Sequence, residues 1–167
     1  MKIKILLLIM IILTSTSYAE KKWKVEEGAI YTNGIAVNGH RFGFFNDKEF
    51  CDHDLIFVHW STYEKGLEKF EGIDVQIAIY LDNNKEPVLI MPSTLMTTLD
   101  FTSIMTVGVF KTIVFSKDVI EKIKKSNSVK LEFIGPENLI SVLDMKFDEF
   151  DTSGLQEAYL KLDNSCK

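Results

Sequence analysis

The residues best suited to chemistry in this chain gather around position 51. Cys51-Asp52-His53-Asp54 is followed by His59, and thiol, imidazole and carboxylate groups are common ligands of zinc. His53 and His59 would share one face if the residues between them formed one extended strand. These two histidines are therefore the candidate ligands of a divalent metal. Zinc sites usually show a second tight ligand pair, so we expect a solvated turn instead and predict no cofactor.

Hydrolytic chemistry has weaker support in the sequence. Ser61 lies two residues from His59, but no Gly-x-Ser-x-Gly motif surrounds any serine. Four carboxylates could pair as acid and base, although such a run is more often the polar edge of a hairpin and a helix entry: Asp144, Asp148, Glu149 and Asp151. There is no phosphate-binding loop, dinucleotide fingerprint or haem-attachment motif. We therefore predict a protein that is not an enzyme, with a hydrolase or metal protein as the third hypothesis.

The chain contains two cysteines, Cys51 and Cys166. In an exported protein, two cysteines form a bridge more often than they remain as two free thiols. A Cys51–Cys166 disulfide would close a loop over most of the domain and contribute roughly 4 kcal/mol or more if it is unstrained. An intermolecular bridge and a reactive thiol are the alternatives.

The first 19 residues have the pattern of a signal peptide. Lysines at positions 2 and 4 precede the apolar run 5–13, and Ser17-Tyr18-Ala19 places small residues where a signal peptidase cleaves. A membrane span needs about 20 apolar residues, so we expect cleavage before Glu20 and no transmembrane anchor. Residues 20–167 then form one domain in the periplasm or outside the cell.

Net charge excludes one class of partner. Removing the leader leaves 17 basic and 24 acidic residues, a net charge of −7. An acidic protein without a basic stripe repels phosphate, so we do not expect nucleic-acid binding. The overall charge mildly favours a basic partner over an acidic one.

Hydrophobic periodicity predicts a mainly antiparallel β fold. Residues 73–81 alternate apolar and polar side chains, and so do residues 129–134, as in strands with one buried face. A second strand of the closing pair is expected at 139–147. Helical spacing predicts one short helix with Val119, Ile120 and Ile123 on its apolar side, and a second from Leu155 to Cys166. The expected architecture is β-sandwich-like with six to eight strands and two short helices; an α+β fold is the alternative.

Two segments are candidates for an interface. Phe42, Phe44 and Phe45 crowd together before Cys51, and such aromatic density requires either a core, which we expect, or a binding surface as the alternative. The segment 93–103 has no clear period and is rich in threonine and serine, so we expect a long functional loop. Its candidate interface residues are Thr94, Thr97 and Thr98.

The C-terminal layout resembles a known family. A short helix is followed by the expected strand pair and by Phe150-Asp151-Thr152-Ser153-Gly154-Leu155-Gln156-Glu157-Ala158. Over roughly the last fifty residues, this layout is similar to the end of the invasion-associated locus B family of small exported bacterial proteins. The resemblance implies an exported β-sandwich protein without a settled biochemical activity.

These observations favour a non-enzymatic, exported binding module whose partner is a protein or a component of the cell envelope. The alternative is a periplasmic inhibitor or immunity protein whose acidic loops block a basic hydrolase. Its association would be steered by charge and would slow as salt rises.

Overall fold

The computed structural model of the protein describes residues 23–26, 28–45, 54–102, 104–114 and 117–163. The predicted leader, Cys51, His53 and Cys166 lie outside the described residues, so the metal pair and the disulfide stay predictions.

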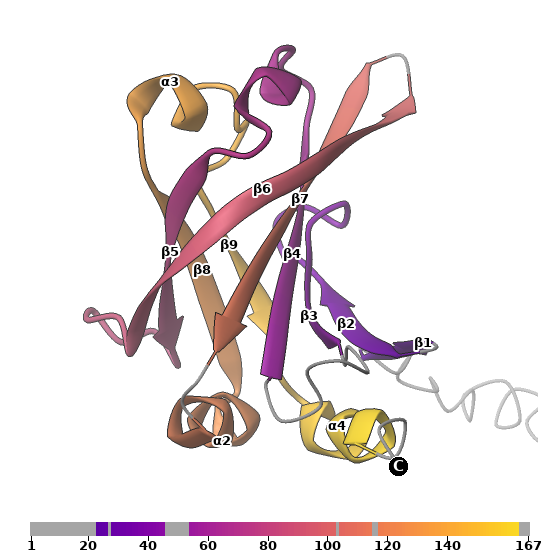
Figure 1. Cartoon of the computed structure of the whole chain (residues 1–167). Coiled ribbons are helices and arrows are strands. Elements are labelled where there is room, and N and C mark those ends of the chain that lie inside the picture. Colours follow the sequence, from indigo (N-terminus) through magenta and orange to yellow (C-terminus); the bar gives the residue numbers. More distant parts are fainter. Residues whose placement is uncertain (1–22, 27, 46–53, 103, 115–116, 164–167) are drawn as a thin grey trace, which may run out of the picture.

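One sheet of nine strands forms the body of the described chain (Figure 1). The strands are β1 Lys24–Glu26, β2 Ala29–Asn33, β3 Arg41–Phe45, β4 Asp54–Thr62, β5 Asp74–Leu81, β6 Leu89–Thr102, β7 Met105–Val114, β8 Ser128–Ile134 and β9 Phe147–Asp151. Their order in the sheet is β1-β2-β3-β4-β7-β6-β5-β8-β9, and every neighbouring pair is antiparallel.

The sheet curls until its two margins meet. At the end of β2, Gly34 forms an isolated antiparallel bridge with Phe150 of β9. The Ile35 N–H also donates to the Glu149 carbonyl at 2.8 Å. The prediction of a mainly antiparallel β protein is confirmed, but one closed sheet replaces the two packed layers of a sandwich. Closure satisfies backbone groups that two open margins would expose.

Helices cover the ends of this closed sheet. They are the 3₁₀-helix η1 Leu67–Phe70 and the α-helices α2 Lys117–Lys125, α3 Glu137–Ile140 and α4 Leu155–Asp163. Figure 1 shows α2 and α4 together at one end and α3 at the opposite end. The predicted apolar faces of α2 and α4 are buried, as their helical spacing requires. Among the described residues, no helix combines the length and apolar character needed to cross a membrane.

Two sequence-based assignments are wrong. Residues 93–102, expected as a loop, belong to the 14-residue strand β6. A register shift between Leu95 and Thr97 interrupts its alternation, and such a bulge hides the two-residue period of a strand. The second strand of the C-terminal pair begins at Phe147 instead of residue 139, because Pro136 precedes the helical turn α3. Proline suits the position before a helix but not the interior of a sheet.

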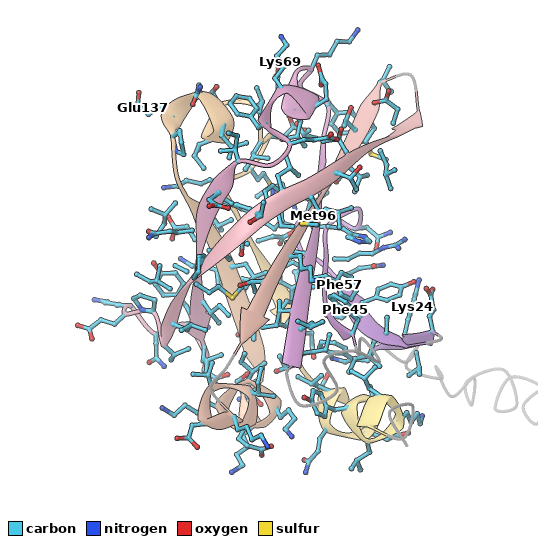
Figure 2. All side chains as sticks on the ribbon, in the orientation of Figure 1. Lys24, Phe45, Phe57, Lys69, Met96 and Glu137 are labelled. Carbon is cyan, nitrogen blue, oxygen red and sulfur yellow. The ribbon has the colours of Figure 1, made fainter. Side chains whose placement is uncertain are left out.

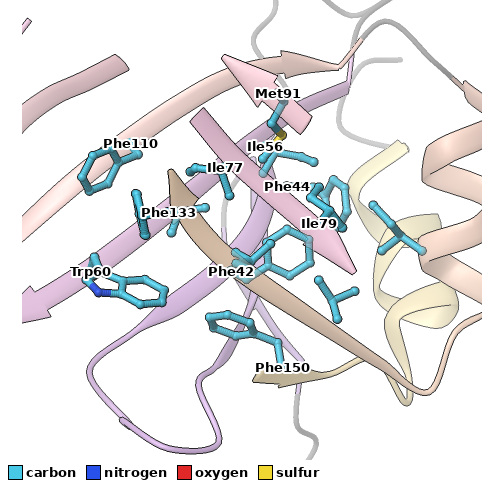
Figure 3. Packing of buried hydrophobic residues seen from close by; sticks show 14 of the residues in the cluster. Phe42, Phe44, Ile56, Trp60, Ile77, Ile79, Met91, Phe110, Phe133 and Phe150 are labelled. Atoms are coloured by element: carbon cyan, nitrogen blue, oxygen red, sulfur yellow. The ribbon is translucent and has the colours of Figure 1, made fainter. Parts of the chain in front are cut away.

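Aromatic side chains fill the inside of the sheet (Figure 3). The ring of Phe133 lies 4.9 Å from that of Trp60 and 4.7 Å from that of Phe110. Phe42 and Phe44 are 0% and 1% exposed, so they belong to the core as expected, and the alternative of an interface is wrong for both. Because large side chains occupy the interior, a binding site must be sought on the outside.

A buried ion pair lies where the sheet closes. His40 and Asp148 are both buried, and their side chains meet with 2.9 Å between Nδ1 and Oδ2. The His40 ring stacks on Trp60 at a centroid distance of 3.7 Å. His40 Nε2 lies 3.1 Å from the Ser61 carbonyl oxygen, which can only accept a hydrogen bond. This contact ties the loop between β2 and β3 to both β4 and β9.

The surroundings of Asp148 hold its carboxylate in the ionised form. Burial favours the neutral acid, but hydrogen bonds from His40 and from the N–H groups of Ala36, Glu149 and Val37 outweigh it, so the pKa of Asp148 is lowered. An ionised carboxylate can only accept. His40 Nδ1 therefore donates to this carboxylate.

Gly34 makes this arrangement possible. A Cβ at position 34 would collide with Asp148 Oδ2 and would lie 2.8 Å from the Val37 carbonyl oxygen. The backbone therefore approaches the carboxylate more closely than any residue with a side chain allows.

We predict that Asp148→Asn lowers the free energy of unfolding at pH 7 by about 3–5 kcal/mol, because it removes the buried carboxylate that pairs with His40 and accepts from three backbone N–H groups. Since the folded pKa of Asp148 is lowered, its stabilisation is present above the ordinary aspartate pKa of about 4 and is lost as the pH falls through the folded value. Urea unfolding at pH 7 and at acidic pH should therefore show a smaller acid-induced loss in Asp148→Asn than in the wild-type protein.

Asp74→Asn is the matched control, because the Asp74 side chain is exposed on β5. Equal losses in the two variants at pH 7 would contradict the importance of the buried pair.

Candidate functional site

A hollow of about 430 Å³ lies on the outer face of β2, β3, β4 and β7. We call it the outer groove and define it by Tyr31, Arg41, Phe45, Phe57, His59 and Val109. Its volume falls within the range of small-molecule sites, and its mixture of aromatic groups with a few polar ones is also typical of them.

Sheet register brings the groove residues together. Tyr31 of β2 faces Gly43 of β3, which in turn faces Phe57 of β4. In the next outward-facing row, Arg41 faces His59 and His59 faces Val109. Because successive side chains on a strand point to opposite faces, the same strands supply the core with one set of residues and the groove with the other.

Gly43 leaves room for the aromatic wall. A Cβ at this position would lie 2.7 Å from the Phe57 ring, so the ring occupies the space that a side chain would fill. The Phe57 ring then lies 6.0 Å from Phe45, 6.4 Å from Tyr31 and 5.0 Å from His59. Figure 2 shows Phe45 and Phe57 next to each other on this part of the sheet. The result is a continuous, partly buried aromatic surface.

Three cations surround this aromatic surface. The Arg41 guanidinium lies 4.8 Å from the Tyr31 ring centroid, Lys24 Nζ lies 5.9 Å from the same centroid, and Lys111 Nζ lies 5.5 Å from that of Phe45. Cations within about 6 Å of a ring face are attracted by its electrons. In the described part of the chain, none of the three forms an ion pair, whereas four other lysines do.

Hydrogen bonding and burial decide the charges of the remaining groove residues. The Tyr31 hydroxyl donates to Glu26 Oε1 at 2.7 Å, and this hydrogen bond, with burial, raises the pKa of Tyr31. The pKa of His59 is lowered, first by burial and second by the positive charge of Arg41. At neutral pH the groove therefore contains a neutral imidazole beside a guanidinium.

The four remaining residues predicted for an interface do not all lie at the outer groove. Phe45 lines the groove, and Thr94 and Thr97 continue its two rows, since they face Lys111 and Val109 across β6 and β7. Thr98 is tied elsewhere, because its N–H and hydroxyl both donate to Glu71 Oε1, at 2.6 and 2.7 Å.

The residues considered for catalysis do not assemble into a reactive site. Ser61 is 4% exposed, and its carbonyl accepts from His40. Asp148 is held in the buried ion pair, and Asp144 accepts from the Thr62 hydroxyl and the Tyr63 N–H. Within the described ranges, no three side chains of the His, Cys, Asp and Glu types converge as a metal site requires.

Arg41, Tyr31 and Phe57 were not predicted as site residues from the sequence. One feature of the sequence could have identified Arg41. Arg41 is the single arginine of a chain that contains eighteen lysines. Arginine differs from lysine in its planar fork of donors and in its stacking on aromatic rings. Tyr31 and Phe57 give no comparable signal, because their distance along the chain hides the pairing that brings them together.

No protein-family model, curated protein or solved structure matches this chain. The resemblance to the invasion-associated locus B family therefore stays a prediction, and the function must be inferred from the geometry of the outer groove.

We predict that His59 loses its proton below the ordinary histidine pKa of about 6.5, as its burial and the nearby guanidinium require. Arg41→Gln removes the positive charge next to His59 and should raise its pKa only in part, because His59 remains buried. NMR titration of the imidazole signals measures both values. Lys146→Gln, at a lysine paired with Glu132 on β8, is the control and should leave the His59 titration unchanged.

Proposed function

We propose that the protein is an exported, non-enzymatic binding module that holds its ligand in the outer groove. The observation that carries this proposal is a partly buried aromatic surface beside an arginine that forms no ion pair with any described residue. An aromatic wall left partly open to water gains free energy when an apolar ligand covers it, at about 25 cal/mol per Å² of apolar surface removed from water.

The composition of the groove supports binding without catalysis. Of its described lining, His59 is the side chain most suited to act as a base near neutral pH. No serine, threonine or cysteine belongs to that lining, so a nucleophile for His59 to activate is missing from it. Tyr31 is already engaged with Glu26.

Export to an oxidising compartment is part of the same proposal and rests on the sequence. The leader pattern of residues 1–19 and the pair of cysteines support it. Helix α4 ends at Asp163, three residues before Cys166, so a Cys51–Cys166 bridge would tie the chain after α4 to the segment between β3 and β4.

A second hollow favours the inhibitor hypothesis as a second candidate. It has a volume of about 520 Å³, and Glu64, Glu68 and Asp100 belong to its lining. Tyr63 and Ile104, which also line it, are 64% and 67% exposed. Carboxylates around exposed apolar side chains complement a basic partner. The outer groove is the stronger candidate because its cations form no ion pair with the described residues and its rings are partly buried.

We predict that the mature protein binds the uncharged dye Nile red in the outer groove, with a rise in dye fluorescence. Phe57→Ala should weaken this binding about tenfold, because it removes the central ring of the aromatic surface. Leu99→Ala, at a residue of β6 that is 56% exposed, is the matched control. Thermal melting of each variant reports whether the fold is intact; equal dye affinity in Phe57→Ala and wild-type protein would exclude the groove.

We further predict that protein recovered from its natural compartment resists alkylation until it is reduced, because Cys51 and Cys166 form an intramolecular bridge. The intact mass after treatment with iodoacetamide, measured with and without prior reduction by a phosphine, tests this. Two thiols that react without reduction would remove the support for export to an oxidising space.

A further inference from the structure

Arg41, the arginine in the lining of the outer groove, indicates the chemical class of the ligand. Arg41 is placed against the Tyr31 ring, and Tyr31 is itself held by its hydrogen bond to Glu26. A guanidinium that stacks on a fixed ring has already lost part of its conformational freedom, so less is lost when it binds a ligand.

The ligand should supply an anionic partner for Arg41, because Glu26, the carboxylate in the described lining, accepts from Tyr31 and forms no ion pair with Arg41. Arg41 forms no ion pair in the described part of the chain, and neither does Lys111 or Lys24 at the two sides of the aromatic surface. The protein is acidic overall, yet three cations surround this groove. An anion placed here gains charge-assisted hydrogen bonds, which are stronger than neutral ones.

A carboxylate fits this position better than a dianion. The planar fork of one guanidinium matches the two oxygens of a carboxylate. His59 beside it is neutral near pH 7, because burial and Arg41 both lower its pKa, and therefore offers no second full charge. Lys24 and Lys111 lie at the two sides of the aromatic surface, so Arg41 is the one cation placed beside His59 to contact the anionic group directly. One guanidinium stabilises one negative charge more readily than two, since each additional charge must be desolvated.

The remaining space requires a flat apolar body. Phe45 and Phe57 lie side by side at 6.0 Å, with Val109 on the neighbouring strand. Aromatic groups pack against such rings in offset or edge-on arrangements. The volume of about 430 Å³ suits a ligand of one or two fused rings.

We propose that the outer groove binds a small aromatic monocarboxylate, whose carboxylate is held by Arg41 and whose rings lie against Phe45 and Phe57. This inference rests on the proposed function, because it assumes that the groove is the binding site.

The test compares two probes that differ in charge and have the same ring system, 2-naphthoate and 2-naphthylmethanol. Calorimetry on the mature protein should give about ten- to a hundredfold tighter binding of naphthoate, as expected for a hydrogen bond to a charged group. Arg41→Gln should abolish this preference, because it weakens naphthoate binding far more than alcohol binding; an equal loss for the two probes would overturn the inference. Arg41→Lys should retain part of it, because the charge remains but the planar fork is lost. Lys146→Gln is the control for a change of net charge.

A second measurement identifies the position of the carboxylate. The positive charge of Arg41 lowers the pKa of His59, and a carboxylate bound to Arg41 offsets that charge. Saturation with naphthoate should therefore raise the pKa of His59. The alcohol carries no charge and should not have this electrostatic effect. NMR titration measures the pKa of His59 in the wild-type protein with and without naphthoate, so this test does not depend on the folding of a variant.

The outcomes separate the two proposals. Equal affinity for both probes, weakened in both cases by Phe57→Ala, would leave the binding function in place and overturn the carboxylate inference. If neither probe binds at millimolar concentration, the proposed function and this inference both fail.

Discussion

The buried pair of His40 and Asp148 is the interaction on which the closed sheet depends. A curled sheet must join two margins that are far apart in sequence, and here residues 108 positions apart meet at 2.9 Å. Burying two charges is costly unless each is fully hydrogen-bonded. Asp148 accepts from three backbone N–H groups as well as from His40, and the second ring nitrogen of His40 lies 3.1 Å from the Ser61 carbonyl oxygen. Such a pair specifies one register of closure, since a shift by one residue would leave both charges unpaired.

Closure explains why the groove lies outside. Once the margins join, inward side chains of β3, β4, β7 and β8 converge and fill the interior with aromatic rings. The outward side chains of β3, β4 and β7 are left to form the groove. Both sets come from the same strands, so the stability of the core and the shape of the groove have a common origin in sheet register. Gly43 contributes to both the core and the groove. Its neighbours on β3, Phe42 and Phe44, point into the core, and on the outer face the Phe57 ring occupies the space where a side chain of residue 43 would lie.

Local charge matters more for this groove than the charge of the whole chain. The net charge favoured a basic partner, and the second hollow with its carboxylates agrees with that expectation. The outer groove has the opposite character, because Lys24, Arg41 and Lys111 come from three strands to surround it. Screening confines the effect of distant charges to about 8–10 Å at physiological salt. A ligand in the groove therefore responds to these cations more than to acidic residues elsewhere.

The sequence by itself determined the mainly β class, the strands around residues 73–81 and 129–134, and the buried faces of α2 and α4. Each of these depends on a periodicity that is local in the chain. Tertiary structure alone decided that β6 is a strand, that Phe42 and Phe44 are core residues while Phe45 lines a groove, and that His40 is paired with Asp148. The physical reason is that these assignments depend on pairing between strands distant in sequence, and on a bulge and a proline that interrupt the local period.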